Sequence, residues 1–183
     1  MREHRRHAAL SLDGGIHEIP VDAVPGRLWL CGKHVVGPDP ERVLEAVGAD
    51  VVVCLTERHE LSGRYPTYTT WLDANAGQRA LWFPVHDFHA PDSTEGAQLL
   101  ADLETRLRAG QGLVVHCGAG IGRAGTVAVA LMVLLDMPLD EALDHVRRHR
   151  PAAGPEVGVQ LAFVQAVSAA RCCPPAAGGP AAN

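Results

Sequence analysis

The chain has 183 residues, of which 47% are hydrophobic and 20% charged, and its formal net charge is −5. This size and composition are those of one globular domain with its own core. A negative chain offers no basic surface to nucleic acid or to an anionic membrane, and its longest apolar run, residues 126–135, is too short to cross a bilayer. We therefore expect neither a nucleic-acid nor a membrane partner.

Short apolar runs alternate with helical patterns along the chain. The runs predict strands at residues 27–31, 51–55, 80–85 and 113–116. Capping residues, prolines and glycines that end helices predict helices over residues 40–47, 93–110, 123–135, 139–149 and 155–167. They also predict a helix that ends at residue 77. The run VVVCL is continuously apolar, which indicates a strand covered on both faces.

This alternation predicts an α/β fold, with a central mixed sheet of about four to five strands flanked by helices. We expect a flexible N-terminal tail over residues 1–20, a single catalytic domain over 21–169, and a disordered tail rich in Pro, Gly and Ala over 170–183.

The chain has five cysteines, an odd number, and their spacing is not that of a disulfide-bonded framework. We therefore expect no disulfide scaffold, and we expect a cytoplasmic location. Cys31 and Cys54 lie in apolar strand-like runs and are interpreted as buried, inert thiols. Cys172 and Cys173 border the C-terminal tail. Cys117 differs from all of them, because a glycine-rich loop follows it.

That loop, HCGAGIGRAGT, allows two interpretations. Gly120, Gly122 and Gly125 match the G-x-G-x-x-G pattern of a dinucleotide-binding loop, whereas Cys117 and Arg123 match C-x5-R. The dinucleotide interpretation needs a strand after the loop helix, with an acidic residue at its end. No such strand follows, so we do not favour it, and no cofactor is expected.

The C-x5-R interpretation uses what is present. A thiolate that attacks a phosphate dianion must be surrounded by positive potential, which converging backbone N–H groups and a helix N-terminus supply. The glycines let the backbone curl, and the planar guanidinium of Arg123 matches two phosphate oxygens. The same field favours the thiolate form of Cys117.

HCGAGIGRAG resembles the H-C-x-x-G-x-x-R signature of the protein tyrosine phosphatase superfamily. Further segments resemble its atypical dual-specificity members, including the cyclin-dependent kinase inhibitor 3-like phosphatases. These segments are LWLCG, VVVCLTERHEL, FPVHDFHAPD and RPAAGPEVGVQLAFV, so the resemblance extends over residues 21–168.

The resemblance implies a role for each matching residue. Cys117 is expected to be the nucleophile of a phosphocysteine intermediate, and Asp87 the general acid. Asp92 is the rival acid, although its sequence context favours capping the following helix. Phosphate is expected to bind to Arg123 and to the backbone amides of the loop, which are those of Gly118, Ala119, Gly120, Ile121, Gly122 and Arg123.

Other polar residues near the motifs have two interpretations each. His116 either steadies the thiolate or is a buried histidine at a strand end. His86 and His89 flank Asp87, but two histidines without a third ligand are interpreted as loop residues, so no metal is expected.

The C-terminal third raises the same question. Glu156 and Gln160 match a segment that borders the active site in relatives, where either could position water or serve helix packing. The basic residues before them are interpreted as a solvated helix end: His145, Arg147, Arg148, His149 and Arg150.

The substrate stays open between a phosphorylated protein and a small phosphate ester such as a sugar or nucleoside phosphate, with inorganic phosphate as the product in both cases. Lipid-specific members of the resembled family often carry lysines in this loop, and residues 118–122 contain none, so the resemblance argues against phosphoinositides. A catalytically impaired phosphate-binding module is the remote alternative. We expect a monomer.

One position departs from the family pattern. Most relatives have Ser or Thr directly after the arginine, and here that residue is Ala124. Thr126 is about 200° further around the helix, so we expect that it does not replace the missing hydroxyl.

Overall fold

The computed structural model describes residues 15–172. Its centre is a five-stranded sheet of order β1-β2-β5-β3-β4, in which β1 is antiparallel to β2 and the other neighbours are parallel. The strands are β1 (His17–Ile19), β2 (Arg27–Gly32), β3 (Val51–Cys54), β4 (Ala80–Trp82) and β5 (Gly112–Cys117).

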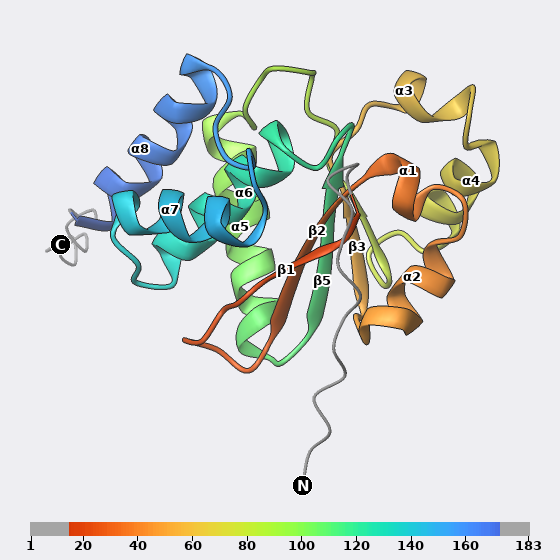
Figure 1. Cartoon of the computed structure of the whole chain (residues 1–183). Helices are drawn as coiled ribbons and strands as arrows, with labels where there is room; N and C mark the ends of the chain where they lie inside the picture. The colour runs from red at the N-terminus through yellow and green to blue at the C-terminus, as the bar shows by residue number, and fades with distance from the viewer. Residues whose placement is uncertain (1–14, 173–183) are drawn as a thin grey trace, which may run out of the picture.

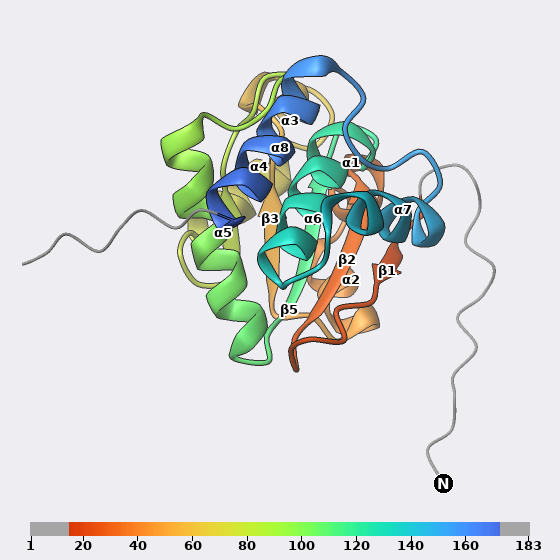
Figure 2. The same cartoon turned by 90° about the vertical axis from the view of Figure 1, so that its left-hand side faces the viewer.

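Helices cover both faces of this sheet, as Figures 1 and 2 show. One face packs against α1 (Lys33–Val36), α2 (Pro40–Val47), α3 (Arg58–Ser62) and α4 (Pro66–Ala74). The other packs against α5 (Ser93–Arg108), α6 (Gly122–Leu134), α7 (Leu139–His149) and α8 (Gly158–Cys172). The mixed α/β sheet expected from the sequence is confirmed.

The central strand β5 is buried at every residue, because it has a strand on each side and helices on both faces. It leads into α6, which is buried from Gly122 through Val133. The carboxyl ends of β2, β5 and β3 therefore meet at one edge of the sheet, where parallel α/β folds place their sites.

Several boundaries differ from the sequence-based predictions. β1 lies inside the stretch expected to be a tail and pairs with β2 from His17↔Leu30 to Ile19↔Leu28. The strand expected over 80–85 ends at Trp82, although the Phe83 and Val85 N–H groups still donate to the Cys54 and Leu55 carbonyls at 2.9 and 3.0 Å. The last helix begins at Gly158 rather than 155 and runs to Cys172, past the expected domain limit at 169. Residues 1–14 and 173–183, with the rest of both expected tails and Cys173, lie outside the described residues.

Local capping explains the helix starts. Asp92 accepts the Thr94 N–H at 2.9 Å and so caps α5. A reciprocal capping box occurs at α3, where Glu57 and Glu60 each bind the other's backbone. The short helices α1 and α3 were not predicted, because neither is long enough to show an apolar periodicity.

Candidate active site

The loop after β5 begins at Cys117, whose residue surface is 3% exposed. Gly120 has φ +74°, and a Cβ there would lie 2.2 Å from the Cys31 carbonyl oxygen, so only glycine fits. The loop ends at Gly122, the first residue of α6. Cys117 thus faces a helix N-terminus, whose free N–H groups and dipole attract anions.

Arg123 is buried next to this loop and fixed by a carboxylate that the sequence analysis missed. Its Nη1 and Nη2 donate to Glu60 Oε1 and Oε2 at 2.6 and 2.9 Å, and Nη1 also donates to the Val85 carbonyl at 2.8 Å. Burial raises the pKa of Glu60, but hydrogen bonding and attraction from Arg123 outweigh it and lower the pKa to about 2. Glu60 lies within VVVCLTERHEL, one of the segments that resemble the family, and this resemblance was the one signal in the sequence that could have identified it.

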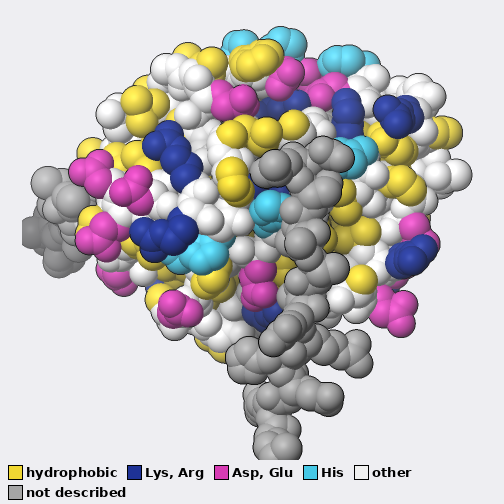
Figure 3. All heavy atoms as spheres, in the orientation of Figure 1, with side chains coloured by type: hydrophobic (Ala, Val, Ile, Leu, Met, Phe, Trp, Pro, Cys, Tyr) yellow, Lys and Arg dark blue, Asp and Glu magenta, His cyan; other side chains and the backbone are white. Residues whose placement is uncertain are grey.

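A pocket of about 310 Å³ opens over Cys117. Its residues come from the end of β5 and the loop after it, α1, α3, α6, the β4–α5 loop and the segment before α8: Lys33, Glu60, Asp87, Phe88, Cys117, Gly118, Ala119, Gly122, Arg123 and Glu156. Lys33, also missed from sequence, lies with its Nζ 3.7 Å from Glu60 Oε2. In Figure 3 histidine and acidic side chains, with basic ones among them, gather at the top of the molecule, above the sheet edge where β2 and β5 end.

The two candidate acids lie in different places. Asp87 lines the pocket, and its Oδ1 is 3.0 Å from Arg123 Nη2. Asp92 caps α5 and does not line the pocket. Phe88, directly after Asp87, has φ +58° and is more than half exposed, so a strained residue borders the pocket.

His116 lies on the other face of the sheet from Cys117, as successive strand residues do. Its Nε2 is 2.6 Å from the Tyr68 hydroxyl, and its Nδ1 is 3.4 Å from the Cys117 carbonyl oxygen. Complete burial lowers the pKa of His116 to about 4, so the ring is neutral at pH 7. This placement supports the interpretation of His116 as a buried histidine at a strand end. Its one contact with Cys117 is with the backbone carbonyl oxygen.

Gln160 is fully buried at the start of α8, and both ends of its amide have partners. Its Nε2 donates to the His89 carbonyl at 3.1 Å, and its Oε1 accepts the Glu156 N–H at 2.8 Å. The amide therefore joins α8 to the loop that carries Asp87, and its Nε2 lies 3.3 Å from the position that a Cβ on Gly122 would take. Glu156 does face the pocket, because a Cβ on Gly122 would lie 1.9 Å from its Oε2.

We expect Gln160→Glu to displace the Asp87 loop, since a carboxylate cannot donate to the His89 carbonyl. The rate should fall more for phosphate esters with poor leaving groups than for those with good ones, by about tenfold in the ratio. Steady-state kinetics across a series of aryl phosphates measures this, with the exposed Gln165→Glu on the same helix as the control. Equal losses for all leaving groups would contradict a role in holding that loop.

The remaining polar candidates are occupied elsewhere. His86 Nδ1 is 2.9 Å from Glu57 Oε2, and His89 Nδ1 is 2.9 Å from the Asp87 carbonyl oxygen. Within residues 15–172, no three His, Cys, Asp or Glu side chains gather as a metal site.

The interpretation of residues 145–150 as a solvated helix end is wrong for Arg150. Arg147 and Arg148 are exposed, but Arg150 is buried, 3% exposed, against the loop that follows Cys117. His145 and His149 are half-buried, and the first bonds to the Pro20 carbonyl through Nε2 at 2.8 Å.

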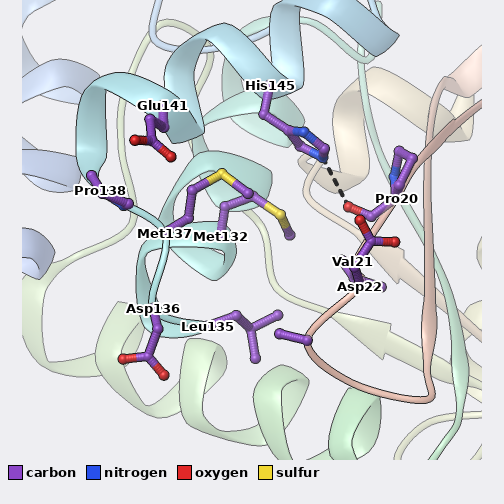
Figure 4. A pocket seen from close by; sticks show the side chains of 11 residues that line it. Pro20, Val21, Asp22, Met132, Leu135, Asp136, Met137, Pro138, Glu141 and His145 are labelled. Carbon is purple, nitrogen blue, oxygen red and sulfur yellow. Dashed lines mark hydrogen bonds between the residues drawn. The ribbon is translucent and has the colours of Figure 1, made fainter.

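A second pocket, of about 270 Å³, lies at the opposite end of α6, about 20 Å from the loop along the helix axis. Figure 4 shows Met132, Leu135 and Met137 in its wall, with three carboxylates around them, those of Asp22, Asp136 and Glu141. Among the described residues, no Lys or Arg lines this second pocket, whereas Lys33 and Arg123 accompany the carboxylates of the pocket over Cys117, so the pocket over Cys117 is the candidate active site.

Glu60→Gln should destabilise the protein by about 3 kcal/mol at pH 7, because it removes the partner of a buried arginine. The folded pKa of Glu60 is depressed to about 2, so its contribution is complete above the unfolded value of 4.5 and is lost as pH falls through 2. Urea unfolding should therefore show that the free energies of unfolding of the variant and the wild type differ less at pH 3 than at pH 7. The exposed Glu45→Gln on α2 is the control; a difference independent of pH would contradict the assignment.

A mixed sheet whose central strand ends in a C-x5-R loop is the arrangement of the cysteine-dependent phosphatases. A family model described as Swiss Army Knife protein, DSP-PTPase phosphatase domain, matches residues 23–161. The chain belongs to this family of dual-specificity-type phosphatase domains in the protein tyrosine phosphatase superfamily, as the sequence resemblance indicated.

Curated relatives and solved structures agree. Human dual specificity protein phosphatase 5 is 35% identical over 86 residues, which cover 46% of this chain and 22% of that protein. Human dual specificity protein phosphatase 22 is 43% identical over 58 residues, 31% of each. The chain thus spans less than a third of the length of these curated relatives.

The active form of Tk-PTP superposes with a TM-score of 0.67 at 30% identity, covering 84% of this chain and 97% of that one. Kinase associated phosphatase, with its catalytic-site cysteine replaced by serine, gives a TM-score of 0.71 at 22% identity over 90% of this chain and 99% of its own, which shows the shared fold. None of the helices within residues 15–172 has the length and apolar content that a membrane span requires.

Proposed function

We propose that this protein hydrolyses phosphate monoesters through a phosphocysteine intermediate on Cys117. The observation that carries the proposal is the meeting of Cys117, Arg123 and Asp87 in one pocket, with Asp87 Oδ1 3.0 Å from Arg123 Nη2. No metal is required, because the loop amides and Arg123 provide the positive potential for a dianion.

The donors of Arg123 divide into two sets. Of its five N–H groups, three are used by Glu60 and the Val85 carbonyl. The other two are Nε–H, for which no partner is found among the described residues, and the second hydrogen of Nη2, whose nitrogen lies 3.0 Å from Asp87 Oδ1 in an ion pair. These two lie side by side and form the fork that binds two phosphate oxygens. Asp87 must therefore leave Nη2 when the substrate enters.

In the first step the Cys117 thiolate attacks phosphorus, and the bond from phosphorus to the ester oxygen breaks. Asp87 gives its proton to that oxygen, which leaves as an alcohol or phenol. In the second step Asp87 takes a proton from water as its oxygen attacks phosphorus. The P–S bond breaks, its electron pair returns to sulfur, and inorganic phosphate is released.

Hydrolysis of a generic aryl phosphate in excess EDTA tests this chemistry. We expect full activity, proportional to enzyme, and competitive inhibition by inorganic phosphate. Absence of hydrolysis together with retained phosphate binding would identify the impaired binding module instead.

We propose a phosphorylated protein as the substrate, in line with the names of the curated relatives. The exposed Phe88 at the mouth of the pocket supports this, since it offers an apolar contact to a side chain beyond the phosphate. Comparison of kcat/KM for phosphopeptides with that for sugar and nucleoside phosphates is the test. Preference for a small phosphate ester would replace this substrate class.

We further propose that the protein acts as a monomer in the cytoplasm. Both edge strands, β1 and β4, have three residues, which leaves little unpaired edge for another chain. The odd number of cysteines supports a reducing compartment.

Ala124→Ser should raise kcat. Ala124 is buried directly after Arg123, and the Thr126 hydroxyl donates to the Gly122 carbonyl at 2.7 Å, so it is not free to stabilise the leaving thiolate. A missing charge-assisted donor costs about 1.5 to 3 kcal/mol at the step that returns charge to sulfur. Rapid-quench kinetics on the wild type should show a burst equal to enzyme concentration, smaller in Ala124→Ser. A linear time course with no gain in the variant would contradict slow hydrolysis of the intermediate.

A further inference from the structure

The phosphate-binding loop can point its N–H groups inward only if its carbonyl groups point outward and find donors there. Each of its outward carbonyls has one. Gly118 O accepts the Lys33 N–H at 3.1 Å, and Ile121 O accepts the Gly154 N–H at 3.2 Å. The two between them, Ala119 O and Gly120 O, accept from one side chain, that of Arg150, at 2.9 and 2.6 Å.

Arg150 is the C-cap of α7 and lies entirely beneath the loop. Its Nη1 donates to the carbonyls of Gly15 and Leu30 at 2.7 and 3.3 Å. The guanidinium therefore joins the N-terminal segment, β2 and the loop through four carbonyl groups.

This buried cation has no carboxylate partner among the ion pairs of residues 15–172. Burial lowers the pKa of Arg150, whereas the nearby thiols of Cys31 and Cys117 raise it. An uncompensated buried charge is costly, so an arginine here requires a counter-charge. The anion that the loop binds provides that charge.

We infer that Arg150 is a positioning residue that holds residues 118–121 in their anion-binding shape and adds a second cation below the loop, opposite Arg123. It does not touch the substrate. Lysine cannot replace it fully, because adjacent Nε and Nη2 donors are needed for two consecutive carbonyls. The inference rests on the proposed function, since it takes the loop to be a phosphate site.

The experiment measures inorganic phosphate binding by its protection of Cys117 from iodoacetate, with the modified residue identified by mass spectrometry. The variants are Arg150→Met, Arg150→Lys and the exposed control Arg148→Met, and circular dichroism reports their folding. The other charged groups that line the pocket, Lys33, Glu60, Asp87, Arg123 and Glu156, are unchanged in all of them.

We expect Arg150→Met to weaken phosphate binding about tenfold or more, because the donors that hold two consecutive loop carbonyls are lost. The phosphate affinity of Arg150→Lys should lie between those of Arg150→Met and the wild type. The phosphate affinity of Arg148→Met should equal that of the wild type. A folded Arg150→Met with wild-type phosphate affinity would overturn the inference.

If Arg150→Met does not fold, Arg150→Lys decides, and wild-type affinity in that variant overturns the inference in the same way. Failure of the proposed function gives a different result, because phosphate would then fail to protect Cys117 in the wild type itself.

Discussion

Cys117→Ser is expected to abolish turnover while leaving phosphate bound. A serine hydroxyl in the same position is not ionised at neutral pH, so no covalent intermediate forms, and we expect a loss of roughly 10⁴-fold or more in kcat. The loop amides, Arg123 and Glu60 stay in place, and their contacts do not involve the sulfur. Steady-state kinetics and isothermal titration with inorganic phosphate measure the two effects separately.

Cys54→Ser is the matched control, because Cys54 is a buried thiol at the end of the neighbouring strand, with its Sγ 3.1 Å from the Thr56 hydroxyl. It should keep normal kinetics. Turnover of Cys117→Ser within about a hundredfold of wild type would exclude Cys117 as the nucleophile.

The core of the fold was readable from sequence because its elements carry local signals. VVVCL and GLVVHC are largely apolar runs, as strands buried on both faces require. The glycines after Cys117 predict a turn. β1 lacked such a signal. It has three residues, and only pairing with β2 makes it a strand.

The site was only partly readable, for a related reason. Cys117 and Arg123 lie six positions apart in one motif, whereas Glu60 reaches Arg123 from 63 residues away in the chain. No local pattern distinguishes the glutamate that will meet a buried arginine from one on the surface. Arg148 and Arg150 show the same limit, because two positions in RRHR separate an exposed side chain from a buried one.

Asp87→Asn is expected to lower kcat by about 10²- to 10⁴-fold for esters with poor leaving groups, because expulsion of an alkoxide needs a proton. With a good leaving group such as nitrophenolate the first step should be nearly unaffected. The position also gives the variant a second property. Asp87 competes with phosphate for Nη2 of Arg123, at 3.0 Å, and a neutral amide competes less. Phosphate should therefore inhibit Asp87→Asn at lower concentration than wild type, so that kcat falls while apparent affinity rises.

Asp92→Asn is the control for this assignment, since asparagine is as good an N-cap as aspartate and α5 should keep its start. The kcat of Asp92→Asn should depend on the leaving group to the same extent as the kcat of the wild type. If Asp92→Asn showed the loss with poor leaving groups and Asp87→Asn did not, the acid would be Asp92. Its side chain would then have to leave the Thr94 N–H and reach a pocket that it does not line in this structure. Asp87, by contrast, needs only to exchange Arg123 for the ester oxygen, because both lie in the same pocket.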